Sequence, residues 1–301
     1  MSSVHCGKVK TTILTPTYNR AYTLSRLYDS LMRQKDKRFV WLIVDDGSDD
    51  NTKEIVDRFK QHDFLIRYIY KGNGGKHTAI NWGVGFIETD YTFVVDSDDF
   101  LTDNAMELIN HWVDEIEGLP EFAGVAGTRV KDDKANSIIG QFPVACEYID
   151  CLNSERKQKK LLGDKAEVYK TELLKQNPFP EYKNEKFIPE SVVWNKFSLM
   201  GLKVRWHKEG IVVCTYLEDG LTCATKKMSH FEKNFWGYRD DYKLRLKVMK
   251  FPYNYLAGSV FCAKCYALGK GKKCLDDFKL SIFGKALIKI LGIIRYQLGR
   301  Y

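Results

Sequence analysis

The sequence predicts an α/β protein whose open, parallel sheet is covered by helices. Two observations support this fold class. Short apolar runs rich in β-branched residues alternate with helical patterns over residues 1–130, and the connections between them are short. Such alternation implies right-handed βαβ crossovers, which place successive strands parallel. The 301 residues, 44% of them hydrophobic, are enough for a substantial core in one large or two moderate domains.

Five strands are expected in this first part of the chain. The second, Phe-Val-Trp-Leu-Ile-Val, is almost continuously apolar, as in a strand buried on both faces of a parallel sheet. The first is expected to stop at Thr15-Pro16. The expected strands cover residues 9–14, 39–44, 64–70, 91–95 and 122–127.

Helical patterns lie between these strands. The first has apolar and aromatic residues at spacings of three and four, namely Tyr22, Leu24, Leu27, Tyr28 and Leu31. The helices are expected over residues 21–34, from about residue 51, and over residues 76–86 and 104–116. The middle of the chain is less regular, with a helix expected over residues 190–200 and short strands over residues 202–206 and 211–216.

Charge is unevenly distributed along the chain. Residues 225–301 hold 17 basic and 5 acidic residues, a net charge of +12, whereas the rest of the chain is mildly acidic. Such a tail suggests an anionic partner, either a membrane surface or a nucleic acid; a solvated basic face is the alternative. No apolar run reaches the length of a membrane span, and no secretory signal is visible. The eight scattered cysteines then predict a reduced, cytoplasmic protein with free thiols.

The last part of the tail predicts a basic amphipathic helix. Its apolar residues recur at helical spacing, namely Leu280, Phe283, Leu287, Ile290, Leu291, Ile294 and Leu298. Its flanking basic residues are Lys279, Lys285, Lys289, Arg295 and Arg300. A helix of this kind either lies in a membrane interface with anionic lipid or packs on the preceding domain. The sequence leaves both alternatives open.

Unusual polar residues fall where the predicted strands end, the edge of a parallel sheet at which ligands bind. Asp96-Ser97-Asp98-Asp99 follows the fourth strand. Carboxylates this close repel one another, and a hard divalent cation such as Mg²⁺ or Mn²⁺ offsets the repulsion with one or two carboxylates plus substrate phosphates. A helix N-cap is the structural alternative for a single aspartate.

Two further motifs belong to the same edge. Asp45-Asp46 ends the second strand and suits hydrogen bonds to a ribose or a base, although an Asx turn explains it equally well. Asn73-Gly-Gly-Lys76 follows the third strand, and its amides and lysine suit an anion at a helix start. The segment is neither a Walker A loop nor a dinucleotide fingerprint.

Together these motifs resemble the family 2 glycosyltransferases, which have the GT-A fold. The resemblance rests on Thr15-Pro-Thr-Tyr-Asn-Arg20, Val44-Asp-Asp-Gly-Ser-Asp-Asp50, Asn73-Gly-Gly-Lys76 and Val95-Asp-Ser-Asp-Asp99, and it covers the first 120 residues well. It implies a Rossmann-like, mixed but mostly parallel sheet. It also implies a catalytic domain of residues 1–224, with a nucleotide-sugar half to about residue 120 and an acceptor half beyond, followed by a helical basic extension of residues 225–301.

The resemblance also implies roles for individual residues. The donor would be held by Pro16, Thr17, Tyr18, Asp45, Asp46, Asn73, Lys76, Asp96 and Ser97, with Tyr18 stacking on the base. Asp98 would bind the metal, Mn²⁺ or Mg²⁺. Glu190, four residues before Trp194, matches the family's general base, although Pro189 replaces the usual glutamate before it; Asp164 is the alternative base.

The implied reaction is metal-dependent and inverting. Glu190 takes the proton of an acceptor hydroxyl as the hydroxyl oxygen attacks the anomeric carbon of a nucleotide sugar, with UDP-sugars favoured. The acceptor would be a glycan or lipid-linked glycan of a bacterial surface polysaccharide, reached from the inner face of the cytoplasmic membrane. One alternative is a sugar-phosphate nucleotidyltransferase. Another is a non-enzymatic binder of anionic surfaces or nucleic acid, although the acidic strand ends disfavour nucleic acid.

Overall fold

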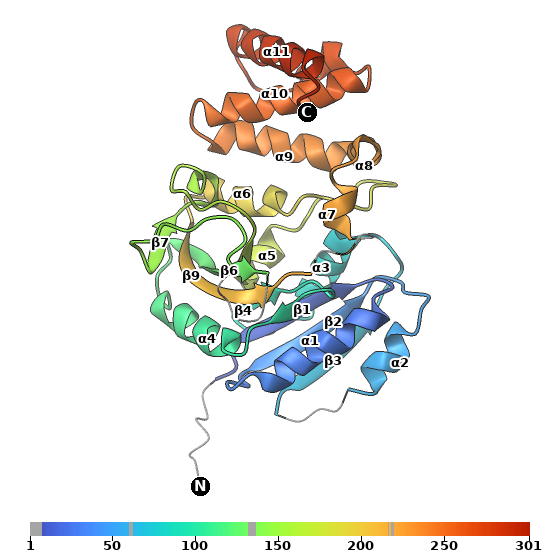
Figure 1. Cartoon of the computed structure of the whole chain (residues 1–301), viewed down its shortest axis with the longest axis vertical. Helices are drawn as coiled ribbons and strands as arrows, with labels where there is room; N and C mark the ends of the chain where they lie inside the picture. The colour runs from blue at the N-terminus through green and yellow to red at the C-terminus, as the bar shows by residue number, and fades with distance from the viewer. Residues whose placement is uncertain (1–7, 60–62, 132–136, 216, 218–219) are drawn as a thin grey trace.

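The computed structural model describes residues 8–59, 63–131, 137–215, 217 and 220–301. A nine-stranded sheet forms the centre of the molecule, and a stack of helices from the C-terminal part of the chain lies at one end of it (Figure 1). The strand order is β3-β2-β1-β4-β8-β6-β9-β5, with β7 paired to β9.

The N-terminal half supplies four parallel strands. These are β1 (Thr11–Thr17), β2 (Phe39–Asp45), β3 (Leu65–Tyr70) and β4 (Tyr91–Val94). The helices between and after them are α1 (Ala21–Arg33), α2 (Thr52–Asp57), α3 (Lys76–Val84) and α4 (Ala105–Glu115). Each predicted strand and helix of this half is present, with ends shifted by a few residues.

The second half completes the sheet with mixed pairing. Strand β8 (Lys165–Lys170) lies antiparallel between β4 and β6 (Phe122–Val130), and β6 runs parallel to β9 (Lys203–Val213). Two short strands, β5 (Phe100–Leu101) and β7 (Tyr148–Cys151), pair antiparallel with β9. The remaining elements of this half are η1 (Asn153–Glu155), α5 (Thr171–Gln176) and α6 (Ser191–Leu199).

Two strand predictions are wrong in detail. The first strand does not stop at Thr15-Pro16 but runs to Thr17, and Pro16 pairs with Val44 of β2. The pairing of β1 with β4 ends at Leu14, so Pro16 lies where the strand has a neighbour on one side only and its missing N–H leaves no gap in the ladder.

The two short strands expected over residues 202–206 and 211–216 form one strand, β9. Long-range pairing with β6, β7 and β5 carries it through the polar residues between the two apolar runs. Tyr216, the last residue of the expected strand, lies outside the described residues.

The sheet has a buried apolar layer on each face. Helices α1, α2 and α4 cover one face, where Leu27, Trp41 and Ile109 are fully buried. Helices α3, α5 and α6 cover the other, where Ile80, Val193 and Phe197 are buried. Because β2 is buried from both sides, its continuous apolar sequence is explained.

The C-terminal part of the chain is helical, as predicted. It contains α7 (Leu221–Ala224), α8 (Met228–Lys233), α9 (Phe235–Val248), α10 (Tyr253–Ala267), η2 (Gly271–Lys273) and α11 (Ile282–Gln297). Phe231, Phe261 and Leu275 belong to a separate apolar cluster among these helices. None of the described helices has the length and apolar character needed to cross a membrane. The boundary between a catalytic domain of residues 1–224 and an extension of residues 225–301 stays a prediction.

Candidate active site

The predicted site residues from β1 and β2 lie side by side at one edge of the sheet. Thr17 pairs with Asp45 in the parallel register, and the Asp46 N–H donates to the Thr17 carbonyl over 2.8 Å. Thr17 is buried at this edge, whereas the Tyr18 side chain that follows is 47% exposed. Tyr18 is therefore accessible to a ligand, and Pro16 and Thr17 present backbone at the same edge.

A lysine joins the acidic turn after β4 to the start of α6. The Lys76 Nζ lies 2.5 Å from the Asp96 carboxylate and 2.8 Å from the Glu190 carboxylate. Burial would lower the pKa of Lys76, but the two carboxylates outweigh it and raise the pKa well above its usual value. The same lysine helps to hold the pKa of Asp96 below its usual range against the effect of burial. Residues 20 to 114 positions apart in sequence thus form one charged cluster, with Glu190 at the N-cap of α6.

Asp98, the predicted metal ligand, is only partly buried in the same turn. Burial and then the charge of Asp96 raise its pKa above the usual value. Arg26 donates to the Asp98 backbone carbonyl over 2.5 Å, which fixes the turn without using the carboxylate. Ser97, between the two aspartates, is buried.

The Asp98 carboxylate is an oxygen donor of the kind that a hard divalent cation binds. The described residues contain no group of three or more His, Cys, Asp or Glu side chains arranged to hold a metal ion. An ion at Asp98 would therefore need substrate oxygens or water for the rest of its coordination. That is the usual arrangement for Mg²⁺ with nucleotide substrates, which it shares with one or two carboxylates.

Asp99 has a different environment from Asp96 and Asp98. Its carboxylate lies 2.6 Å from Arg129 Nη1 and accepts the Thr215 N–H over 3.0 Å. Burial raises the pKa of Asp99 although Arg129 opposes the shift. The pair ties the acidic turn to β6 and to the segment after β9, so Asp99 has a structural partner that the sequence did not indicate.

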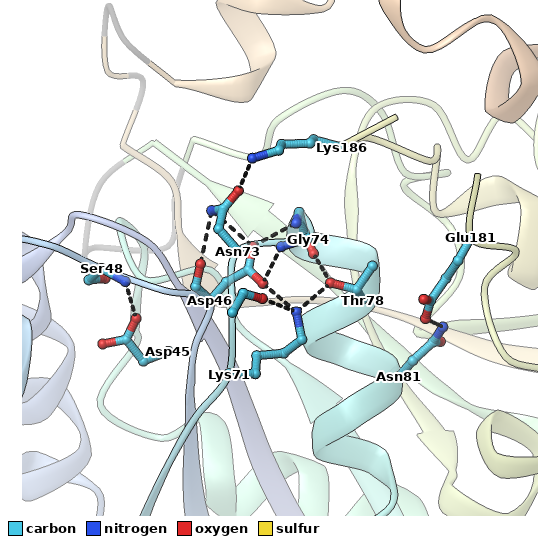
Figure 2. Close-up of polar contacts among 12 residues, drawn as sticks. Asp45, Asp46, Ser48, Lys71, Asn73, Gly74, Thr78, Asn81, Glu181 and Lys186 are labelled. Atoms are coloured by element: carbon cyan, nitrogen blue, oxygen red, sulfur yellow. Dashed lines mark hydrogen bonds and ion pairs between the residues drawn. The ribbon is translucent and has the colours of Figure 1, made fainter. Parts of the chain in front are cut away.

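Asp45 and Asp46 are buried and hydrogen-bonded within the protein (Figure 2). Asp45 accepts the Ser48 N–H over 2.7 Å and the Tyr68 hydroxyl over 2.6 Å. Asp46 accepts from more donors, namely Lys71 Nζ at 2.7 Å, Gly74 N at 3.0 Å, Gly75 N at 2.6 Å and Asn73 Nδ2 at 3.3 Å. Its carboxylate therefore organises the glycine turn.

The glycine turn is held against the chain that leads into α6. Gly75 has φ +97°, and a Cβ there would lie 2.1 Å from the Lys186 carbonyl oxygen, so only glycine allows this approach. Lys186 also donates to the Asn73 side chain (Figure 2). Further along α3, Asn81 Nδ2 donates to Glu181 Oε1 over 2.9 Å. These contacts fix the donor-side loop relative to the segment that carries Glu190.

The two candidates for a general base differ in position. Glu190 belongs to the Lys76 cluster, and its side chain is 35% exposed. Asp164 is exposed in the turn before β8. The geometry therefore brings Glu190, and not Asp164, into contact with the residues of the predicted donor site.

A further buried acid, Glu167, was not anticipated from the sequence. It lies on β8, which pairs with β4, and its nearest ion-pair partner is Arg156, at 3.9 Å. Burial raises the pKa of Glu167 to about 7; Arg156 lowers it and the charge of Glu190 raises it. The one available signal was the alternation in Lys165-Ala-Glu-Val-Tyr169, which places the glutamate on the same side of the strand as Tyr169.

Comparison with known proteins gives a consistent result. The family model described as Glycosyl transferase family 2 matches residues 12–176, more than half of the chain. The glycosyltransferase GlyG of Streptococcus pneumoniae serotype 4 is 33% identical over 104 residues, which are 34% of this chain and 35% of that protein. The chain thus aligns with about a third of the length of this curated relative.

Two solved structures resemble the whole chain in fold. Staphylococcus aureus TarS residues 1–349 in complex with UDP-GlcNAc has 17% identity and a TM-score of 0.66, over 97% of this chain and 90% of that one. The mannosyltransferase PcManGT of Pyrobaculum calidifontis, in complex with GDP-Man and Mn²⁺, has 16% identity and a TM-score of 0.59, over 98% of this chain and 89% of that one. The predicted fold class, a mixed α/β sheet of GT-A type with a helical C-terminal region, is confirmed.

Proposed function

Because the chain belongs to glycosyltransferase family 2, as its motifs predicted, we propose that it is a metal-dependent, inverting glycosyltransferase that uses a nucleotide sugar. The observation that carries the proposal is the Lys76 cluster. It gathers a metal-type acidic turn, a glycine turn at a helix start and the carboxylate of Glu190 at one edge of the sheet. The family match favours this reaction over sugar-phosphate nucleotidyl transfer, and the carboxylates at this edge disfavour nucleic acid.

The donor is proposed to be a UDP-sugar bound along the ends of β1, β2 and β4. Tyr18 is exposed and suits stacking on a uracil, while Pro16 and Thr17 supply backbone groups beside it. Asp45, which pairs with Thr17 in the sheet, would contact the base. Asp96 would contact the ribose, and Ser97 would lie beside the diphosphate. Asn73 and Lys76 would contact the phosphates. That TarS was crystallised with UDP-GlcNAc agrees with this choice of nucleotide.

Asp46 is proposed to position this site and not to touch the donor. Its carboxylate already accepts four hydrogen bonds from the glycine turn and from Lys71. A carboxylate offers about four acceptor positions, so none remains for a ligand. Its role is then to hold Asn73 and Lys76 where the phosphates would bind.

Asp98 is proposed to hold Mn²⁺ or Mg²⁺. Bound there, the ion would supply Lewis-acid stabilisation to the charge that develops on the diphosphate leaving group. Asp96 is engaged by Lys76, which leaves Asp98 as the carboxylate of the turn available to the ion.

Glu190 is proposed as the general base. Lys76 fixes the position of its carboxylate at the edge where the donor is proposed to bind, and an acceptor hydroxyl within hydrogen-bond reach of that carboxylate can give up its proton to it. The acceptor hydroxyl gives its proton to Glu190, its oxygen forms the bond to the anomeric carbon, and the bond from that carbon to the diphosphate oxygen breaks. A single displacement of this kind inverts the anomeric centre.

The acceptor is proposed to be a glycan, free or lipid-linked, of a surface polysaccharide. It would enter between the nucleotide-binding half, to about residue 120, and residues 121–224, which provide Glu190 and Glu167. A lipid-linked acceptor lies at a membrane, and peripheral association of the enzyme with the inner face of the cytoplasmic membrane is part of the same proposal.

A screen of UDP-, GDP- and dTDP-sugars, with Mn²⁺ or with EDTA, tests the function. We expect release of UDP that requires the ion. Thermal stabilisation by the same compounds is a second readout, because a ligand at 100 times its Kd adds about 2.7 kcal/mol to the free energy of unfolding. The proposal fails if no nucleotide sugar is cleaved or stabilises the protein in the presence of Mn²⁺.

A further inference from the structure

Helix α11 presents an apolar ridge to solvent. The ridge consists of Phe283, Leu287, Ile290, Ile294 and Leu298, which follow one another at spacings of three or four residues, and of Ile282 beside Phe283 at the start of the helix. Ile282 and Phe283 are 85% and 87% exposed, and the other four are between 43% and 58% exposed. Large apolar side chains gathered in this way on a surface indicate a contact with something outside the described chain.

The opposite side of α11 is fixed against α10, so the ridge is not a core face that has failed to pack. Ile288 is fully buried there, beside Gly258 of α10. At Gly292 a Cβ would lie 2.5 Å from the Cys262 Cβ, so the two helices approach closely at that glycine. Ser281 caps the helix by accepting the Gly284 N–H over 3.1 Å. The ridge is therefore on the side of α11 away from α10, and α11 itself lies at one end of the molecule (Figure 1).

Basic residues lie on the flank of the ridge next to Ile282, because Lys285 and Lys289 follow Ile282 at spacings of three and seven residues. Lys285 and Lys289, one helical turn apart, donate to the carbonyls of Asp276 and Lys272 and so adjoin the loop before the helix. That loop adds the exposed side chains of Lys272, Lys273 and Lys279. Of its two exposed aspartates, Asp277 is paired with Lys243, and Asp276 is outnumbered by these three lysines. The flank is therefore positively charged, and the ridge beside it is apolar.

We propose that this surface docks on an anionic lipid membrane, with the ridge inserted at the interface and the flank on lipid phosphates. A helix with one apolar side and a lysine-rich flank binds in this manner. A second copy of the chain suits the surface less well, because it would bring two regions of net charge +12 against each other. The docking deepens the proposed function by naming its anionic partner, but its chemistry is independent of glycosyl transfer.

Docking would set the height of the catalytic centre above the membrane. Helix α11 packs on α10, α10 on α9, and α9 on α6, which begins at Glu190. Packed helices lie about 8–10 Å apart axis to axis, so these three steps separate α11 from α6 by roughly 24–30 Å. An acceptor anchored in the same membrane must extend over that distance, which selects a grown glycan chain over a single sugar on its lipid carrier.

Co-sedimentation of the full chain with vesicles tests the proposal. We expect binding to vesicles of phosphatidylcholine with phosphatidylglycerol that greatly exceeds binding to phosphatidylcholine alone and weakens with salt. The variant Ile290→Ser/Ile294→Ser is expected to bind about 10- to 100-fold more weakly, from the apolar area removed. The variant Lys272→Gln/Lys273→Gln/Lys279→Gln is expected to lose about 100-fold, at roughly fivefold for each charge.

The matched control is Leu199→Ser/Met200→Ser, which removes two apolar side chains that are each 50% exposed at the far end of α6. It should bind vesicles like the unchanged protein. Equal binding by the ridge variant and this control overturns the proposal. So does a concentration-dependent dimer that the ridge variant dissociates while neither protein binds vesicles. Release of UDP in solution should be unchanged in the ridge variant. If the unchanged protein binds vesicles but shows no transferase activity, the proposed function is refuted and the docking stands.

Discussion

Replacing Lys76 by methionine removes the cation that joins two carboxylates while keeping most of the side chain's length and apolar stem. The Nζ atom lies 2.5 Å from Asp96 and 2.8 Å from Glu190, so the two bonded oxygens are at most 5.3 Å apart. Without the ammonium group two negative charges face each other in a partly buried corner. The Asp96 and Glu190 side chains retain only 29% and 35% of their exposure.

The size of the effect follows from that separation. Two like charges about 5 Å apart repel by about 3 kcal/mol at an effective dielectric constant of about 20. Partial exposure screens some of this repulsion, so we expect Lys76→Met to lower the free energy of unfolding by about 2–3 kcal/mol. Lys53→Met is the matched control, because Lys53 pairs with Asp57 at 2.5 Å on a surface where both side chains are 57% exposed. Its expected cost is below about 0.5 kcal/mol.

Urea unfolding followed by tryptophan fluorescence measures both variants. The double variant Lys76→Met/Glu190→Gln isolates the repulsion, because it removes one of the two facing charges. It should recover at least about 1 kcal/mol of the loss while remaining inactive. The reasoning is refuted if Lys76→Met is as stable as Lys53→Met, or if the double variant is no more stable than Lys76→Met.

Three further predictions follow from the site. Asp46→Ala should lower the free energy of unfolding, measured in urea, by about 3–5 kcal/mol, because Lys71 and two glycine N–H groups lose their acceptor. Replacing the exposed Asp49 by alanine should change it by less than about 0.5 kcal/mol. Similar values for the two variants would contradict the role of Asp46. Asp98→Asn should fold normally and lose UDP release at least about 100-fold, and a variant that kept its Mn²⁺-stimulated rate would remove Asp98 from the metal site. Burial raises the pKa of Glu167 from 4.5 to about 7, so between these pH values the folded protein binds more protons than the unfolded chain. The free energy of unfolding should therefore fall by about 2–3 kcal/mol as pH rises through this window. The fall should be absent in Glu167→Gln.

The sequence predicted the N-terminal half of the fold and the edge of the sheet at which the candidate site residues lie. Uninterrupted apolar strands such as residues 39–44 are typical of a parallel sheet between helix layers, and parallel strands place their carboxyl ends at one edge. Asp45, Asp96 and the glycine turn could therefore be assigned to that edge without coordinates. Strands β5, β7 and β8 were not predicted. Strands β5 and β7 are short, and β8 is held by a partner distant in sequence, β4.

The side-chain partners show where sequence reasoning stopped. The sequence allowed Asp45-Asp46 either a ligand-binding or a turn-forming role, and the structure shows Asp46 engaged by the turn that follows β3. Glu167 and the Asp99–Arg129 pair depend on where β8 and β6 lie in the sheet, which is set by tertiary pairing; the local pattern indicated the strand β6 but not its neighbours. Lys76 was expected near a phosphate. Its contact with Glu190, 114 residues away in sequence, could not be expected, because it depends on how α6 packs over the sheet.

Anomalous X-ray scattering from crystals soaked with a UDP-sugar and MnCl₂ tests the central claim most directly. The predicted result is one manganese peak about 2.0–2.2 Å from an Asp98 carboxylate oxygen, with diphosphate oxygens on the same ion and the sugar's anomeric carbon facing Glu190. A donor bound elsewhere, or bound at this edge with no manganese at Asp98, would contradict the account.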